Sequence, residues 1–217
     1  MSVLFLAKEK PFARDAAELV SRHIDKAEII FGRTNEPFPP GLRDKKFDYV
    51  ISYIPPWIVP GQVLDNAKIA AINFHPGPPE YPGIGCTNFA IYYGEKEFGI
   101  SVHYMKEKVD SGDIILVDRF PVFNNDSLYS LTQRCYEHVY SAFKKLFPFI
   151  IEKRSLPRST ETWKRKPFTR KQLNELCRIT LDMTEEEVRR RIKATTYPDM
   201  PGAFIEIFGY KFLYAQD

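Results

Sequence analysis

Two polar side chains, Asn73 and His75, stand two positions apart at the end of an apolar run. Residues i and i+2 of a strand point to the same face, about 6–7 Å apart, so the two groups would act on one space. An amide can donate a hydrogen bond to a developing negative charge, and an imidazole can move a proton near neutral pH. Each residue alone also has an ordinary structural interpretation, because asparagine often forms turns and a single histidine is often a hydrogen-bonded structural residue.

The surrounding sequence alternates between apolar runs and amphipathic segments. Strands are expected at Ser2–Ala7, Glu28–Phe31, Phe47–Tyr53, Ile69–Phe74, Gly99–Tyr104 and Asp113–Phe120, and helices at Pro11–His23, Cys86–Tyr93 and Leu128–Phe149. This order is typical of an α/β fold, here a Rossmann-like, mostly parallel sheet with helices on both faces. Ligands of such sheets bind beyond the carboxyl ends of the strands, which is where Asn73 and His75 lie.

The chain changes character after the long helix, so we expect a main catalytic domain over residues 1–150 and a short C-terminal extension over residues 151–217. The extension would contain a linker at Glu152–Lys171, a helix that begins at the capping box Thr184–Glu187, and a β-hairpin around Gly209. Residues 152–193 carry 13 basic and 7 acidic side chains, whereas residues 1–151 carry 17 and 18. The basic stretch indicates either a solvated surface or a face that attracts a phosphate-bearing ligand.

Composition argues against several classes of protein. No run approaches about 18 apolar residues, and the first apolar run is too short for a signal peptide, so we expect a cytoplasmic protein without a membrane span. Cys86, Cys135 and Cys177 are scattered without a C-x-x-C pair, which favours ordinary packing over disulfides or a metal site. The net charge of +3 lacks the contiguous basic footprint of most nucleic-acid-binding domains.

Two motifs together resemble the catalytic signature of the formyltetrahydrofolate-dependent formyltransferases: N-x-H-P at Asn73–Pro76 and D-S-G at Asp110–Gly112. The resemblance covers roughly residues 2–150 in element order. The loop His75–Gly83 and the segments Ile192–Ala194 and Pro201–Phe204 resemble the nucleotide-sugar N-formyltransferases more than the tRNA enzymes. The resemblance implies N10-formyltetrahydrofolate as the donor, no metal, and three catalytic residues, Asn73, His75 and Asp110.

The chemistry of formyl transfer explains these residue types. An amine attacks the formyl carbon, the carbonyl oxygen becomes negative, and the amine must lose a proton. Asn73 would donate to the oxyanion, and His75 would act as a base or as a second electrophilic donor. Asp110 would orient and charge-stabilise His75, or pass a proton through a water. The other histidines, His23, His103 and His138, have no such context and are predicted to be structural or surface residues.

The resemblance also places the two substrates. The folate ring would lie between the loops Tyr53–Val59 and Lys106–Asp110, with Trp57 and Ile58 covering it, although Trp57 also fits ordinary core packing. The donor-binding candidates are Tyr53, Pro56, Trp57, Ile58, Val59, Glu107, Val109 and Asp110. Two lysines follow the first strand, a position often used to hold phosphate, unless they are simply solvated. The acceptor-binding candidates are Lys8, Lys10, Gly77 and Tyr81.

The leading hypothesis is formyl transfer to a dTDP- or UDP-linked 4-amino-deoxysugar, by a protein with no nucleic-acid or membrane partner that forms a homodimer through its aromatic C-terminal hairpin. The second hypothesis is a methionyl-tRNA formyltransferase; such enzymes generally carry a longer, barrel-shaped C-terminal domain than the about 65 residues after the long helix. Formyltetrahydrofolate hydrolases share the signature but usually begin with a regulatory domain. A Rossmann nucleotide-binding module would need G-x-G-x-x-G after the first strand, where Leu6–Lys10 has no glycine.

Overall fold

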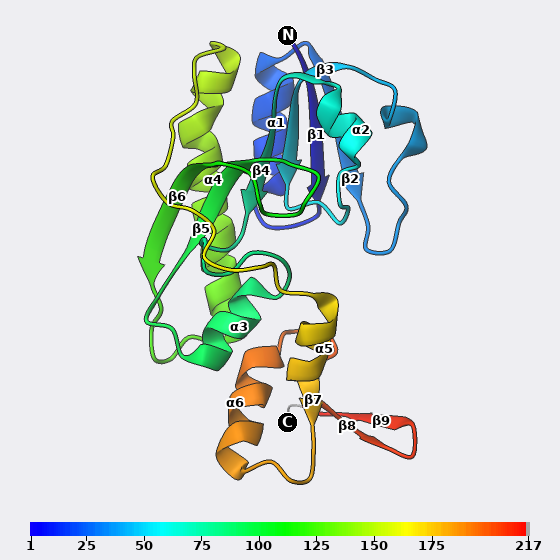
Figure 1. Ribbon diagram of the computed structural model, residues 1–217, viewed down its shortest axis with the longest axis vertical. Coiled ribbons are helices and arrows are strands. Elements are labelled where there is room, and N and C mark those ends of the chain that lie inside the picture. Colours follow the sequence, from blue (N-terminus) through cyan, green and yellow to red (C-terminus); the bar gives the residue numbers. More distant parts are fainter. Residues whose placement is uncertain (216–217) are drawn as a thin grey trace.

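The computed structural model describes residues 1–215, which form a large sheet flanked by helices, with a smaller C-terminal extension at one end of the molecule (Figure 1). The strands are β1 Ser2–Lys8, β2 Lys26–Gly32, β3 Phe47–Tyr53, β4 Ala67–His75, β5 Glu97–Tyr104, β6 Ile114–Pro121, β7 Arg178–Ile179, β8 Phe204–Ile207 and β9 Tyr210–Leu213. The helices are α1 Ala13–His23, η1 Pro40–Leu42, α2 Gly61–Asp65, α3 Cys86–Tyr93, α4 Leu128–Ile151, α5 Arg170–Cys177 and α6 Glu185–Thr195. The predicted α/β fold class is confirmed.

The large sheet has the strand order β2-β1-β3-β4-β5-β6. The strands β1 to β4 run parallel, whereas β5 is antiparallel to both of its neighbours. The pairing sets Ser52 of β3 beside Asn73 of β4, and Asn73 beside His103 of β5. Because directly paired residues share a face of the sheet, three polar side chains stand in one row near the carboxyl ends of β3 and β4.

Both faces of this sheet are covered, which explains why β1 is apolar at nearly every position. Phe5 packs into the large cluster that includes α1 and α4, while Leu4 and Leu6 pack into a second cluster with η1 and α2. The Phe143 ring of α4 lies 6.0 Å from that of Phe5 and 5.4 Å from that of Phe74. The apolar stripe expected on the long helix is buried in this contact: Leu131, Cys135, Val139, Phe143 and Leu146.

Residues 152–169, which we call the strap, lead from the end of α4 back across β5 and β6 to α5 (Figure 1). The predicted linker extended to Lys171, and the structure corrects this boundary because α5 begins at Arg170. Thr169 caps α5 by accepting a hydrogen bond from the backbone N–H of Gln172. The helix is only 8 residues long and mostly polar, so its periodicity was too weak to identify it.

The helix expected after Thr184 is α6, and the Thr184 hydroxyl accepts from the Glu187 backbone N–H at 3.3 Å. This helix docks on α3, where Tyr92 donates to Glu187 at 2.8 Å and Asn88 donates to the Ala194 carbonyl at 2.8 Å. The expected hairpin is formed by β8 and β9, which join β7 in a second sheet. Within residues 1–215, no helix is long and apolar enough to span a membrane.

Candidate active site

The structure brings the three predicted catalytic residues together. Asn73 and His75 lie at the end of β4, and Asp110 lies in the loop between β5 and β6. His75 Nδ1 is 3.3 Å from Asp110 Oδ2, and Asn73 Nδ2 is 3.4 Å from Asp110 Oδ1. The carboxylate therefore bridges the imidazole and the amide that strand alternation places on one face.

Asp110 is held by backbone as well as by side chains. Its φ of 44° lies in the left-handed region, which is uncommon for a residue other than glycine. The backbone N–H of Gly83 donates to Asp110 Oδ2 at 2.7 Å. Burial alone would raise the pKa of Asp110, but His75, His103 and the Gly83 N–H lower it to about 2. The carboxylate is therefore ionised at neutral pH.

Both ring nitrogens of His75 face hydrogen-bond acceptors. Nδ1 faces Asp110, and Nε2 lies 2.9 Å from the carbonyl oxygen of Tyr81. The thiol of Cys86 is 3.6 Å from Nε2. Burial would lower the pKa of His75, but the charge of Asp110 and the contacts with Cys86 and Tyr81 raise it to about 9. The raised pKa favours the protonated imidazole, in which both ring N–H groups have an acceptor, over a neutral ring that acts as a base.

Two further residues complete this cluster. Ser52 Oγ donates to Asn73 Oδ1 at 2.6 Å, which turns Asn73 Nδ2 toward His103 Nε2 at 3.0 Å. His103 Nε2 also lies 3.1 Å from Asp110 Oδ1. The sequence predicted a structural role for His103 and no role in the site for Ser52. The one available signal was a single small polar residue near the carboxyl end of the apolar run Phe47–Tyr53.

The cluster borders an open cavity of about 610 Å³. One group of lining residues comes from α2 and from the loops after β3 and β5. We call it the apolar wall, and its apolar members are Ile54, Pro55, Trp57, Ile58, Val59, Leu64, Met105 and Val109. A second group comes from the end of β1, from α3, α4 and α5, and from the loop after α6. We call it the polar wall after its polar members, Lys10, Thr87, Asn88, Thr132, Tyr136, Arg170, Asn174 and Tyr197.

Six of the predicted donor-binding residues line the cavity: Trp57, Ile58, Val59, Glu107, Val109 and Asp110. The Trp57 indole N–H donates to the Glu36 carbonyl at 3.0 Å, and its ring lies directly over Gly32. A Cβ added to Gly32 would lie 2.1 Å from the Trp57 ring. Trp57 is therefore a fixed part of the cavity wall.

The other two predicted donor-binding residues, Tyr53 and Pro56, lie outside the cavity lining. The alternation that points Ser52 toward the site turns Tyr53 into the core, where its ring lies 5.9 Å from that of Phe74. Pro56 packs beside Trp57 against Gly32, outside the cavity lining. Both residues support the apolar wall from behind.

The predicted acceptor contacts divide in a similar way. Lys10 lines the cavity, with Nζ 5.6 Å from the ring centroid of Tyr136. Lys8 instead donates to the hydroxyl of Thr34, outside the cavity lining. Alternation would put residues 8 and 10 on one face, so the difference arises because β1 ends at Lys8 and the chain leaves the strand before Lys10.

The other two predicted acceptor-binding residues, Gly77 and Tyr81, are not part of the cavity lining. A Cβ at Gly77 would lie 2.7 Å from the Tyr81 carbonyl oxygen and 2.8 Å from His75 Nε2, so this position is filled by the loop itself. The Tyr81 side chain is buried: its hydroxyl donates to Glu95, and its ring stacks on Phe168 at 5.9 Å. Tyr81 acts on the site through its carbonyl group, which accepts from His75.

Most residues of the polar wall were not identified from the sequence. Its polar groups come from separate elements, as with Thr87 of α3, Thr132 of α4, Arg170 of α5 and Tyr197 after α6. Nothing in their spacing along the chain links them. Among residues 1–215, no group of three or more His, Cys, Asp or Glu side chains is placed to hold a metal ion.

Known proteins with similar sequences include formyltransferases named for different substrates. The family model described as formyl transferase matches residues 35–146, just over half of the chain. A methionyl-tRNA formyltransferase of Fusobacterium nucleatum is 26% identical over 176 residues, covering 78% of this chain and 56% of that protein. A GDP-perosamine N-formyltransferase of Brucella melitensis is 29% identical over 163 residues, covering 75% of this chain and 62% of that protein. The chain thus spans little more than half the length of the curated relatives it matches.

Among solved structures, the N-formyltransferase from Helicobacter canadensis in complex with folinic acid and dTDP-3-aminofucose has a similar fold. The TM-score is 0.73 at 19% sequence identity, and the match covers 97% of this chain and 86% of that chain. At this identity the likeness concerns the fold. It extends through the C-terminal elements that contribute the polar wall.

Proposed function

The chain belongs to the formyl transferase family, and on that premise we propose that it transfers a formyl group from N10-formyltetrahydrofolate to the amino group of a dTDP- or UDP-linked 4-amino-deoxysugar. The observation that carries the proposal is one cavity in which a cationic imidazole, an oriented amide and an ionised carboxylate lie beside two chemically different walls. A reaction that joins an aromatic donor to a polar, charged acceptor needs such an arrangement.

The donor supplies an activated formyl group, and the residues of this chain provide the surroundings for its transfer. The positive charge of His75 would stabilise the negative charge that develops on the formyl oxygen, and Asn73 offers its amide from the same face. The bond from the formyl carbon to N10 breaks as the bond to the acceptor nitrogen forms. The acceptor amine loses a proton, which Asp110 relays through a water to N10, so the carboxylate is ionised again once the transfer is complete.

The apolar wall supports the folate assignment. Trp57, Ile58 and Val59 present flat or branched apolar surface from one loop, and Val109 adds more from the second. Such surface suits an aromatic bicyclic ring, while neighbouring backbone groups supply the hydrogen bonds that fix its orientation. The solved relative with bound folinic acid has the same fold.

The polar wall supports a nucleotide-linked acceptor. Lys10 and Arg170 supply positive charge for a diphosphate, and the hydroxyl groups of Thr87, Thr132 and Tyr197 suit a sugar. Burial and the neighbouring Lys8 lower the pKa of Lys10, so a bound phosphate would stabilise its charged form. The similarity to enzymes that act on GDP-perosamine and bind dTDP-3-aminofucose agrees with this class of acceptor.

A methionyl-tRNA formyltransferase is the second candidate, because several of the matched curated proteins carry that activity. The two candidates differ in how the acceptor is held. A tRNA needs many phosphate contacts, so its affinity would fall steeply with salt, whereas a nucleoside diphosphate needs a few local cations.

We also propose that two copies associate through the C-terminal hairpin. Its strands are exposed and rich in large apolar side chains: Ile207, Phe208, Tyr210, Phe212, Leu213 and Tyr214. The strand β9 is an edge strand, and an exposed apolar edge is a template for pairing with another chain. Sedimentation of the full chain tests this: a dimer that dissociates in Phe212→Glu is expected, and a wild-type monomer would contradict it.

The test of function is a formyl-transfer assay with N10-formyltetrahydrofolate against a panel of dTDP-, UDP- and GDP-amino sugars, with initiator methionyl-tRNA in parallel. We expect turnover of an amino sugar, competitive inhibition by its free nucleoside diphosphate, and a modest salt dependence of the acceptor KM. Efficient formylation of the tRNA with no turnover of any amino sugar would establish the second candidate instead.

Donor binding has an independent test in thermal unfolding. Folinic acid should protect the protein in a saturable way, because a ligand that binds only the folded state stabilises it. NAD and S-adenosylmethionine should give no shift. Protection by either of these compounds, with none by folinic acid, would overturn the donor assignment.

A further inference from the structure

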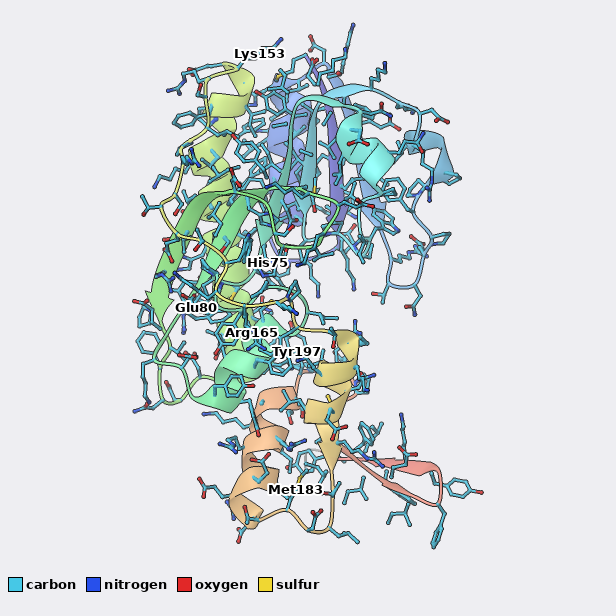
Figure 2. All side chains as sticks on the ribbon, viewed as in Figure 1. His75, Glu80, Lys153, Arg165, Met183 and Tyr197 are labelled. Atoms are coloured by element: carbon cyan, nitrogen blue, oxygen red, sulfur yellow. The ribbon has the colours of Figure 1, made fainter. Side chains whose placement is uncertain are left out.

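Backbone hydrogen bonds tie the strap to the start of β6 and to the loop that follows β4. The backbone N–H of Ser159 donates to the Ile114 carbonyl at 3.0 Å, that of Lys164 to Pro79 at 3.0 Å, and that of Phe168 to Pro82 at 2.8 Å. Figure 2 shows its course: Lys153 is labelled at one end of the molecule, and Arg165 is labelled further along, in the same part of the view as His75 and Glu80. A segment expected from sequence to be a linker therefore lies against the loop that contacts His75.

One strap side chain, Trp163, contacts both histidines of the site. Its ring centroid is 5.0 Å from that of His103 and 5.9 Å from that of His75, with interplanar angles of 88° and 75°. Its indole N–H donates to the Gly112 carbonyl at 2.8 Å, two residues beyond Asp110. Trp163 thus touches the imidazoles and restrains the loop that carries the carboxylate.

Trp163 is itself held in place from both sides. On one side, Glu161 and Glu80 both accept from Arg119 of β6, which joins the strap and the catalytic loop to the sheet. On the other side, the Phe168 ring stacks on Phe89 of α3 at 3.8 Å with an interplanar angle of 10°. A side chain between two anchors can restrict its neighbours because it has little freedom to move away.

We propose that Trp163 is a positioning residue for formyl transfer, which holds the His75 imidazole against Asp110 and keeps water away from the pair. The inference rests on the proposed function and names a residue that acts on His75 rather than on a substrate, since Trp163 is not among the described residues that line the cavity. The groups that face His75 are Asp110, His103, the Cys86 thiol and the Tyr81 carbonyl.

The physical reason is that hydrogen bonds leave an imidazole free to tilt unless its ring faces are packed. Water admitted beside His75 would also screen its attraction to Asp110, because the interaction of two charges weakens as the local dielectric rises. A catalytic group misplaced by about 1 Å costs on the order of 100-fold in rate. Loss of Trp163 should therefore reduce kcat while leaving the substrate-binding walls intact.

The first measurement needs no substrate. Two-bond proton–nitrogen NMR spectra of the four histidines would follow the titration of each ring in the wild type, Trp163→Phe, Trp163→Leu and the exposed neighbour control Thr162→Ala. We expect the pKa of His75 to fall toward its ordinary value by about one unit in Trp163→Leu, because the pairing with Asp110 is weakened. Trp163→Phe, which keeps a ring but loses the bond to Gly112, should be intermediate, and Thr162→Ala unchanged.

The second measurement uses the best acceptor from the panel. In Trp163→Leu, kcat should fall on the order of 100-fold with both KM values within about threefold, and the falling limb of the pH profile should move to lower pH. Trp163→Phe should recover part of kcat. Unchanged titration of His75 together with kcat within about twofold of wild type in Trp163→Leu would overturn the proposal, as would a loss confined to KM.

Two safeguards separate the possible failures. If Trp163→Leu does not fold, as judged by thermal unfolding, Trp163→Phe carries the same comparison with the same two outcomes. If no acceptor is formylated by the wild type, the proposed function fails while the NMR titration still decides whether Trp163 controls His75.

Discussion

The two walls of the cavity are built differently. The apolar wall comes from residues 54–64 and 105–109, two short segments that follow β3 and β5, the strands on either side of β4. The polar wall is assembled from the end of β1, three helices and the loop after α6, which are spread from Lys10 to Tyr197. Under the proposed function, donor binding would be a local property of the sheet, whereas acceptor binding would also depend on how the C-terminal elements pack on it.

The catalytic cluster belongs to neither wall, so its variants should have the largest effect and leave both KM values nearly unchanged. We expect Asn73→Ala to lower kcat by about 10²–10³-fold, the usual cost of removing one oxyanion donor. His75→Asn and Asp110→Asn should be similarly impaired. Steady-state kinetics with both substrates measures this.

The losses of kcat caused by substitutions within the cluster should not be additive. Since Asp110 bridges Asn73 and His75, double variants should lose little more than the single ones. Ser52→Ala, which frees the Asn73 amide without removing it, is the graded control and should fall between wild type and Asn73→Ala. Retention of more than about a third of kcat by Asn73→Ala would remove its assigned role.

The pH dependence should follow His75. Its pKa is raised from 6.5 to about 9 in the folded protein, so the ring stays protonated through neutral pH and loses its proton as pH rises through about 9. The kcat profile should therefore be flat near neutral pH and fall about tenfold per unit above pH 9. The pKa of Asp110, lowered to about 2, places the acidic limb outside the working range.

The matched check is Asp110→Asn, in which the attraction that raises the pKa of His75 is removed. The falling limb should then move to lower pH in whatever activity remains. A profile that instead rises through neutral pH in the wild type would show that His75 works as a neutral base.

The apolar wall can be disturbed alone through Gly32→Ala. The new Cβ would overlap the Trp57 ring and push it from its place, so the donor KM should rise about tenfold while the acceptor KM stays unchanged. Gly41→Ala is the matched control, because a Cβ there meets no atom within 4 Å. Equal changes in both KM values would break the distinction between the walls.

A substitution in the polar wall should change the acceptor KM instead of the donor KM, with the smallest effect of the series. Lys10→Met removes a cation from the cavity, so the acceptor KM should rise about fivefold, as expected for about 1 kcal/mol of Coulomb attraction, with the donor KM unchanged. Lys8→Met is the control, since Lys8 is engaged with Thr34. A larger effect from Lys8 than from Lys10 would reverse the assignment.

Local sequence patterns predict the six strands of the large sheet, the main helices and the candidate catalytic trio. Apolar runs and alternation are local properties, so the bounds of β3 and α3 could be read directly, and Asn73 and His75 had to share a face once β4 was a strand. Asp110 followed from its motif. Alternation also explains why the Tyr53 side chain lies in the core instead of the cavity: its neighbour Ser52 takes the face of the site.

Only the packing of separate elements sets the residues that surround His75 and raise its pKa. The Tyr81 carbonyl reaches Nε2 only because the loop after β4 folds back, and Trp163 reaches both histidines only because the strap returns across β5 and β6. These contacts join residues 6, 60 and 88 positions apart along the chain. Their existence depends on the packing of separate elements, and the periodicity of any one segment carries no information about where another segment will cross it.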